Sequence, residues 1–290
     1  MRPFCAFLVG IFAISTITLA QVAAPKLEFE VASVRPADAS NPQQVTAGLR
    51  IDGSQAHFNS LSLKNLVDRA YNVQPNQVTG PDWISSQRYD ISAKLPDGAT
   101  PDQIPQMLQS LLADRFALKV HKESKDMPAY ALIVGKSLKL QPLPPDDDAA
   151  SANANVNVAV SGSVAGVSFD LGNGSSVTFA NNQFQFKKAT MDVLATGLSR
   201  FLDRPVVNMT NLTGKYDVTL NVTQEDYYIL LVRSGSNAGV MLPPQAMPLL
   251  NGSPVSLFDA IDQQGLHLDA RKLPLDMIVV DSALQTPTEN

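Results

Sequence analysis

The chain has 290 residues, 44% of them hydrophobic and 17% charged, which excludes a disordered chain and is enough to bury one large core or two smaller ones. With 16 Gly, 20 Pro and 1 Cys, it is neither collagen-like nor a disulfide-dense scaffold. The 22 Lys and Arg against 27 Asp and Glu give a net charge of −5, spread evenly, so we expect no nucleic-acid partner.

Residues 1–20 have the order of a secretory signal peptide. Arg2 supplies the positive charge, an apolar run extends from Phe4 to Leu19, and small residues precede a cleavage site near Ala20. The run is shorter than the ~20 residues that cross a bilayer, although a retained anchor is the alternative. We therefore expect a periplasmic or secreted protein, with no transmembrane segment in the mature chain. Cleavage would also remove Cys5, leaving no thiol for a disulfide or a nucleophile.

The first predicted strand is Phe29–Val34. Ser62 then stands as an N-cap before apolar residues at helical spacing, Leu63, Leu66, Val67 and Ala70. Further elements follow in the order short strand, alternating strand, helix and hairpin. These are residues 77–79, Tyr89–Ala93, a helix with Thr100 as N-cap and Pro101 at its first position, and Phe116–His121 paired with Ala129–Val134.

The same order returns in the second half, which we interpret as an internal duplication. Thr190 is the predicted cap of the first helix there, and residues 205–207 are the short strand. The later elements are the alternating strand Tyr216–Val222, a helix that starts near Ser253-Pro254, and a hairpin of Leu266–Ala270 with Met277–Val280. The aligned segments are 55–66 with 183–194, 88–91 with 215–218, and 107–111 with 257–261, after which Phe116 and Leu118 align with Leu266 and Leu268.

Two insertions interrupt this order. Pro- and Asp-rich sequence begins at Pro142, and two strands flank Asn173-Gly174, which favours a hairpin turn. We expect a loosely attached β-ribbon there, and a mobile loop over Arg233–Gly252. The predicted organisation is a signal peptide at 1–20, a first module at 27–143, a linker and ribbon at 144–182, and a second module at 183–290.

The predicted fold class is α+β. Each module has the order α-β-β-α-β-β, with mostly antiparallel sheets and helices on one face. Strands and helices do not alternate one for one, which argues against a doubly wound sheet or a (β/α)8 barrel.

Several segments of the chain carry motifs that occur together in one known group of proteins. They are Phe29–Pro36, Gly80–Trp83, Arg88–Ile91, Leu111–Phe116, His121, Met127-Pro128, Tyr130, Arg204–Val207, Leu212–Asp217, Pro287 and Asn290. These segments resemble a paralogue-rich family of exported proteins of unknown function that is typical of Acidobacteria. The family also occurs fused behind BlaR-type metallopeptidase sensor modules. The resemblance therefore implies an extracytoplasmic sensing or binding module and carries no catalytic residue or cofactor.

Searches for catalytic and metal-binding patterns give no candidate. The sequence contains no GxSxG nucleophile turn, no HExxH, no phosphate-cradling glycine loop and no zinc-ligand spacing. The histidines, His57, His121 and His267, each fall alone in a predicted strand. We therefore predict no catalytic residues, no metal and no cofactor, and a protein that is not an enzyme.

The candidate ligand-binding residues are few. Tyr-Asp occurs in both halves, at Tyr89-Asp90 and Tyr216-Asp217, where a structural role is favoured: the tyrosine packs on the sheet, and the aspartate meets a cation or caps a backbone amide. Trp83 is either a lid over the core or a recognition anchor. The full candidate set is Trp83, Arg88, Tyr89, Asp90, Arg115, His121, Lys215, Tyr216 and Asp217.

The sequence favours an exported, non-catalytic protein that binds or senses an envelope component, a small ligand or a protein partner. A first alternative is a hydrolase whose site lies between the two modules. A second is a structural or assembly module similar to the small periplasmic domains of secretins and TonB-dependent receptors. Exposed sheet edges that capture a partner strand would support the second.

Overall fold

The structure is a computed structural model that describes residues 27–37, 48–100, 103–144, 166–172 and 175–288. The predicted signal peptide at 1–20, the linker over 145–165, Pro101 and the turn at Asn173-Gly174 lie outside these ranges. The α+β fold class is confirmed, with helices and both antiparallel and mixed sheets.

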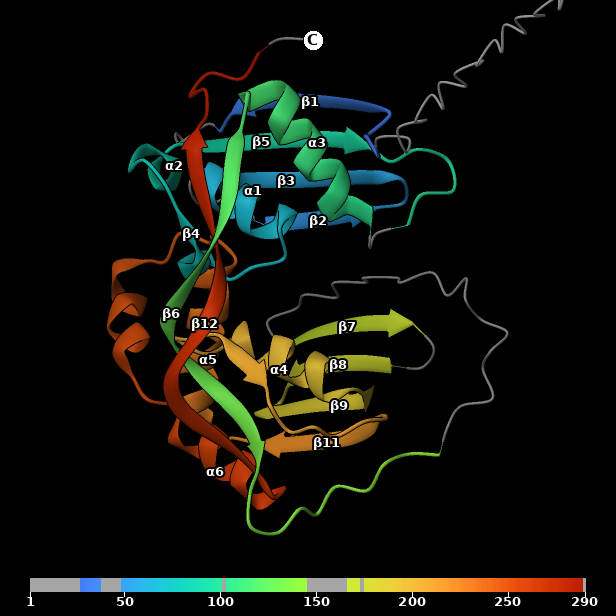
Figure 1. The fold of residues 1–290 in the computed structure, drawn as a ribbon, viewed down its shortest axis with the longest axis vertical. Helices are drawn as coiled ribbons and strands as arrows, with labels where there is room; N and C mark the ends of the chain where they lie inside the picture. Colours follow the sequence, from blue (N-terminus) through green and yellow to red (C-terminus); the bar gives the residue numbers. More distant parts are fainter. Residues whose placement is uncertain (1–26, 38–47, 101–102, 145–165, 173–174, 289–290) are drawn as a thin grey trace, which may run out of the picture.

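Two long strands, β6 (Lys119–Val134) and β12 (Leu266–Ser282), run antiparallel through the molecule and join two lobes (Figure 1). Their pairing extends from Val120 opposite Val280 to Val134 opposite Leu266. Two short strands complete this mixed sheet: β4 (Val78–Thr79) lies parallel to the end of β12, and β10 (Val206–Asn208) lies parallel to the end of β6. Each half of the chain therefore gives one strand to the other half.

The two predicted hairpins are wrong. Residues 119–134 form one uninterrupted strand, and so do residues 266–282. The segments expected to turn, 122–128 and 271–276, contain no glycine or asparagine that favours a tight turn. Each expected hairpin is replaced by one long strand, and the two long strands, β6 and β12, pair with each other. The hydrogen bonds that each hairpin would have made within its own half are therefore made between the halves.

The first lobe has a sheet of strand order β1-β5-β3-β2, with α1 and α3 on one face (Figure 1). Alternating side chains of β3 and β5, such as Phe58 and Ile91, point into its core, which also holds Ile278 and Val280 of β12. The elements are β1 (Val31–Pro36), β2 (Gly48–Asp52), β3 (Gln55–Ser62), α1 (Leu63–Ala70), η1 (Pro75–Gln77), α2 (Trp83–Ser86), β5 (Arg88–Lys94) and α3 (Ile104–Phe116).

The second lobe has a sheet of strand order β11-β9-β8-β7. Its core is rich in aromatic rings, among them Phe179 stacked on Phe184 with centroids 4.0 Å apart, and it includes Leu132 of β6. The elements are β7 (Gly166–Gly172), β8 (Ser175–Ala180), β9 (Gln183–Ala189), α4 (Met191–Ser199), β11 (Tyr216–Asn221), α5 (Gln224–Asn237), η3 (Pro244–Asn251) and α6 (Val255–Gln263).

Element order is the same in the two lobes. The run β3-α1-β4-β5-α3-β6 in the first is matched by β9-α4-β10-β11-α6-β12 in the second. The first lobe adds η1 and α2 to this order, and the second adds α5 and η3. The predicted caps of the first helix in each half are confirmed, because the hydroxyls of Ser62 and Thr190 accept the amides of Asn65 and Val193.

Three local expectations need correction. The ribbon is not loosely attached, because β8 pairs along β9 and buries Val177 and Phe179 in the core. The segment Arg233–Gly252 is not simply a loop: α5 continues to Asn237 and η3 follows, with Arg233 bonded to the Leu250 and Gly252 carbonyls. Finally, α3 begins at Ile104 with Gln103, not Thr100, as its N-cap.

Candidate functional site

The repeated Tyr-Asp pairs hold the same position in both lobes. Each aspartate lies opposite an irregularity in the neighbouring strand of its sheet, β3 or β9, where Ser60 and Lys188 adopt φ of 48° and 45°. The Asp90 carboxylate accepts the Ser60 amide at 2.7 Å, and the Asp217 carboxylate accepts the Lys188 amide at 2.8 Å. The carboxylates thus support the bulged backbone that leads into α1 and α4.

The two tyrosines are buried and bonded to backbone. The Tyr89 hydroxyl donates to the Gln285 carbonyl at 2.6 Å, and the Tyr216 hydroxyl donates to the Thr213 carbonyl at 2.9 Å. Tyr89 also meets Phe116 edge-to-face, and burial raises its pKa to about 12. Both rings belong to the cores of their lobes.

The remaining candidates from the sequence lie apart. Trp83 is half-buried against the core of the first lobe, at the start of α2. His121 and Asp281 form an exposed pair on the β6–β12 ribbon, with Nδ1 and Oδ1 2.8 Å apart. Lys215 is half-buried, and its backbone carbonyl accepts the Leu143 amide. The nine residues therefore do not form one site.

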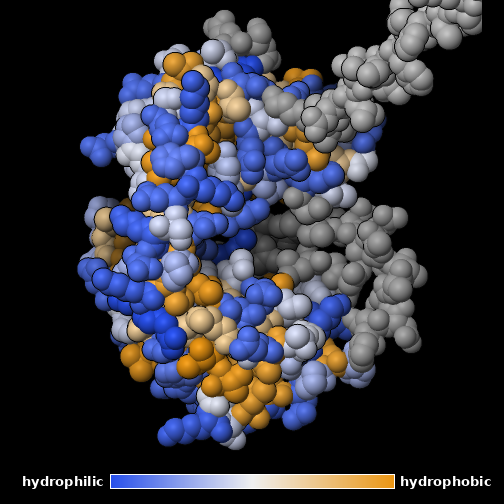
Figure 2. Space-filling model, in the orientation of Figure 1, coloured by the Kyte–Doolittle hydropathy of each residue, from blue (hydrophilic) through white to orange (hydrophobic). Residues whose placement is uncertain are grey.

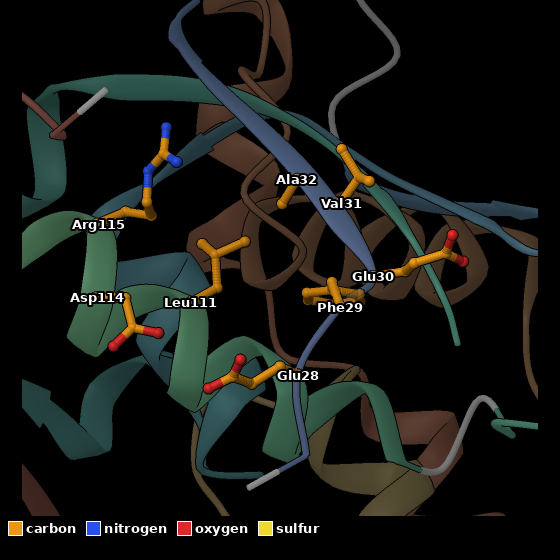
Figure 3. A pocket seen from close by; sticks show the side chains of 8 residues that line it. All are labelled: Glu28, Phe29, Glu30, Val31, Ala32, Leu111, Asp114 and Arg115. Atoms are coloured by element: carbon orange, nitrogen blue, oxygen red, sulfur yellow. The ribbon is translucent and has the colours of Figure 1, made fainter. Parts of the chain in front are cut away.

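Arg115 lines a hollow of about 340 Å³ between the start of β1 and the end of α3 (Figure 3). Its Nε atom is buried and has no hydrogen-bond partner within the described residues. The rest of the lining is acidic or apolar, namely Glu28, Phe29, Glu30, Val31, Ala32, Leu111 and Asp114.

A second hollow, of about 220 Å³, lies between the lobes, and we call it the interlobe hollow. Both lobes contribute polar side chains to its lining. The lining includes one carboxylate, that of Asp203, and no histidine. The first lobe supplies Lys64, Gln74, Pro75 and Asn76, and the second supplies Ser199, Leu202, Asp203, Arg204, Pro205 and Asn237.

A buried charged cluster adjoins the interlobe hollow through α1. Asp68 is only 3% exposed, and Asn65 donates to its carboxylate at 3.3 Å. Burial raises the pKa of Asp68 to about 7, while the positive charges of Arg69 and Lys64 act in the opposite direction. Arg200 is exposed as a residue, yet protein surrounds its guanidinium, and its pKa is lowered by that burial and then by the positive charge of Arg69.

Backbone carbonyls just after the C-terminal end of α5, in the second lobe, accept hydrogen bonds from arginines of the first lobe. Arg69 donates to the Ala238 carbonyl at 3.0 Å, and Arg88 donates to the carbonyls of Gly239 and Ser60 at 2.7 and 2.6 Å. Two cations therefore meet the negative end of a helix, the favourable arrangement for a helix dipole. We call residues 237–239 with Arg69 and Arg88 the interlobe clasp.

Of the predicted site residues, only Arg88 belongs to the clasp. Asn65 and Asp68 were not predicted as site residues. They lie on the polar face of α1, opposite the apolar face, and such a polar face is expected to contact solvent. The apolar face consists of Leu63, Leu66 and Val67. The second lobe covers the polar face. The weak signal in the sequence was the adjacent charged pair Asp68-Arg69 on a short helix.

Among the described residues, no group of three or more histidine, cysteine, aspartate or glutamate side chains is placed to hold a metal ion. In the same residues, every helix is too short or too polar to cross a membrane.

Comparison with protein families gives a match over most of the chain. The model of the family described as "Protein of unknown function (DUF3738)" matches residues 64–283, which include both lobes' helices and the β6–β12 pair. Neither a curated protein nor a solved structure matches the chain.

Proposed function

Since this chain belongs to the DUF3738 family of proteins of unknown function, we propose from its own geometry that it is an exported, non-catalytic protein of the cell envelope that binds or senses a small ligand between its lobes. The observation that carries the proposal is the interlobe hollow, whose lining comes from both lobes. Pockets between packed units are common ligand sites, because a ligand there touches both surfaces.

The connection between the lobes suits such a role. Over residues 121–126 the strand β6 is exposed, and Figure 2 shows hydrophilic side chains over this waist. Over residues 124–126 and the facing 274–276 of β12, no side chain is buried. A two-stranded ribbon without a buried face at this point twists more easily than a packed sheet. Together with the interlobe clasp, it gives two lobes that can change their angle when a ligand fills the hollow.

Export is the second part of the proposal and is supported by the order of residues 1–20. We expect residues 1–26 to direct a fused alkaline phosphatase, which is active only outside the cytoplasm, to the periplasm of a bacterial host. Leu8→Arg, which puts a charge in the apolar run, should abolish that activity. Equal activity with and without the charge would contradict export.

Binding is tested with residues 21–290. We expect native mass spectrometry, after incubation with a small-molecule extract of bacterial envelopes, to show a defined adduct, and small-angle scattering to show a smaller radius of gyration with that adduct. Absence of any adduct would contradict the proposal. Hydrolysis of peptidoglycan, glycan or ester substrates that one point substitution abolishes would favour the hydrolase instead.

A structural or assembly role is the second candidate function. The sheet of the first lobe ends in β1 and β2, which pair on one side only within the described residues. Such edges can receive a partner strand. Sedimentation as a complex with an envelope protein would favour assembly, while a monomer with the ligand adduct would favour binding.

A further inference from the structure

The interlobe hollow has an excess of positive charge, although the chain as a whole carries −5. Lys64 and Arg204 line it from opposite lobes, and Asp203 is the one carboxylate in the lining. Lys64, Arg69 and Arg200 all interact electrostatically with the buried Asp68.

The two lining cations are differently engaged. Arg204 gives its Nε to Asp203 at 3.3 Å and stacks over the Tyr130 ring at 5.5 Å. Within the described part of the chain, Asp203 is the carboxylate that pairs with Arg204. Within the same residues, Lys64 has no carboxylate within ion-pair distance.

The neighbouring acids cancel only part of this charge. Asp203 also accepts the hydroxyl of Tyr130 at 3.1 Å, so its two oxygens are turned to Tyr130 and Arg204. Burial raises the pKa of Asp68 to about 7, so its negative charge is incomplete near neutral pH. The hollow therefore presents more positive than negative charge to an occupant.

We propose that the interlobe hollow binds a small oxyanion, a carboxylate or phosphate group, held between Lys64 of the first lobe and Arg204 of the second. The proposal rests on the proposed function and names the chemistry of its ligand. An ammonium and a guanidinium are the usual partners of such groups, and the side-chain amides of Gln74 and Asn76 add neutral hydrogen-bond donors to the same wall. About 220 Å³ suits a small ion better than a drug-sized molecule.

The position of the two cations gives binding a mechanical consequence. An anion that touches Lys64 and Arg204 together connects α1 to the segment after α4. It would therefore act in the same direction as the interlobe clasp, in which Arg69 of α1 also binds the second lobe. Ligand and clasp then favour the same closed arrangement of the lobes.

The test is isothermal titration calorimetry of residues 21–290 with inorganic phosphate, with succinate and with glycerol as a neutral probe. We expect at least one of the two anions to bind and glycerol not to bind. Lys64→Gln and Arg204→Gln should each weaken anion binding by about tenfold or more, since each removes a charge-assisted contact. Phosphate binding without succinate binding, or the reverse, separates the two sources of the oxyanion.

Matched controls are Lys122→Gln on the exposed ribbon and Arg50→Gln, whose side chain is 75% exposed on β2. They remove the same charges away from the hollow and should change binding less than about twofold. Equal weakening by all four substitutions would overturn the site. Failure of both anions to bind would overturn the oxyanion proposal, and a neutral adduct from the envelope extract would then leave the proposed function intact.

Discussion

The carboxylate of Asp90 accepts a hydrogen bond from the backbone amide of Ser60, 2.7 Å away, at the point where β3 bulges before it enters α1. Ser60 is in the left-handed region, at φ 48°, and is buried. A buried amide at an irregular strand position needs a partner outside the sheet ladder, and Asp90 provides it.

Removing this partner should destabilise the protein. We expect Asp90→Ala to lower the free energy of unfolding by about 1–3 kcal/mol, because it leaves the Ser60 amide without an acceptor. Asp217→Ala should lie at the low end of that range, since Asp217 is exposed and water can replace it. Urea denaturation measures both. Asp97→Ala, an exposed aspartate in a turn, is the control and should change stability by less than about 0.5 kcal/mol.

Local structure was predictable from the sequence where one short segment determines it. The hydroxyl residues Ser62 and Thr190 predict where the helices α1 and α4 begin. The alternation of apolar and polar residues around Tyr89 predicts the strand β5. The partner of β6 was not predictable in this way, because a hairpin and an exchange between lobes need the same apolar pattern. Only the absence of glycine and asparagine from 122–128 distinguished them.

The interlobe surface was unpredictable for the same physical reason. Asp68 and Asn65 stand on the polar face of an amphipathic helix, and only the second lobe makes that face buried. A sequence records which residues are polar. It does not record which polar face meets another lobe, because this depends on how β6 and β12 arrange the lobes.

The close approach of Gly239 to α1 gives a second prediction. Gly239 has φ +83°, and a Cβ there would lie 2.6 Å from the Asn65 side-chain oxygen. Gly98 has a similar φ of +78° with no atom within 4 Å of its would-be Cβ. Both substitutions to alanine carry the left-handed cost of about 1–2 kcal/mol, but only Gly239→Ala also meets a clash.

We therefore expect Gly239→Ala to lose at least about 1 kcal/mol more stability than Gly98→Ala in chemical denaturation. Small-angle scattering should also show a more open pair of lobes for Gly239→Ala alone. Equal losses in the two variants would mean that the interlobe clasp does not constrain this position.

The buried Asp68 predicts a pH dependence of stability. Its pKa is about 7 in the folded protein and 3.8 as the reference value, so the folded state holds more protons than the unfolded state between those pH values. The free energy of unfolding therefore falls as pH rises from about 4 to about 7, because the buried Asp68 carboxylate becomes charged. Above about pH 7 this loss of stability is complete. Lys64, Arg69 and Arg200 are the charged groups that act on it.

Asp68→Asn keeps the shape and removes the ionisation. We expect it to match the native chain near pH 4 and to be more stable at pH 8, by an amount on the order of a few kcal/mol. Thermal melting across this range measures the difference, with Asp97→Asn as the exposed control. A difference that does not change with pH would show that the carboxylate is not the source.

The exchange of β6 and β12 predicts that the halves depend on each other. Residues 27–144 alone lack Ile278 and Val280 from their core, and leave Leu132, which packs in the second lobe, without its partners. Losing two core side chains costs several kcal/mol, comparable to the stability of a small domain.

We expect residues 27–144, expressed alone, to show no cooperative melting transition. Co-expression with residues 166–290 should restore a stable complex, because that fragment supplies Ile278 and Val280 and the core that surrounds Leu132. A monomeric fragment 27–144 with a sharp transition of its own would mean that its core is complete without β12, and that β6 can close on its own half as a hairpin.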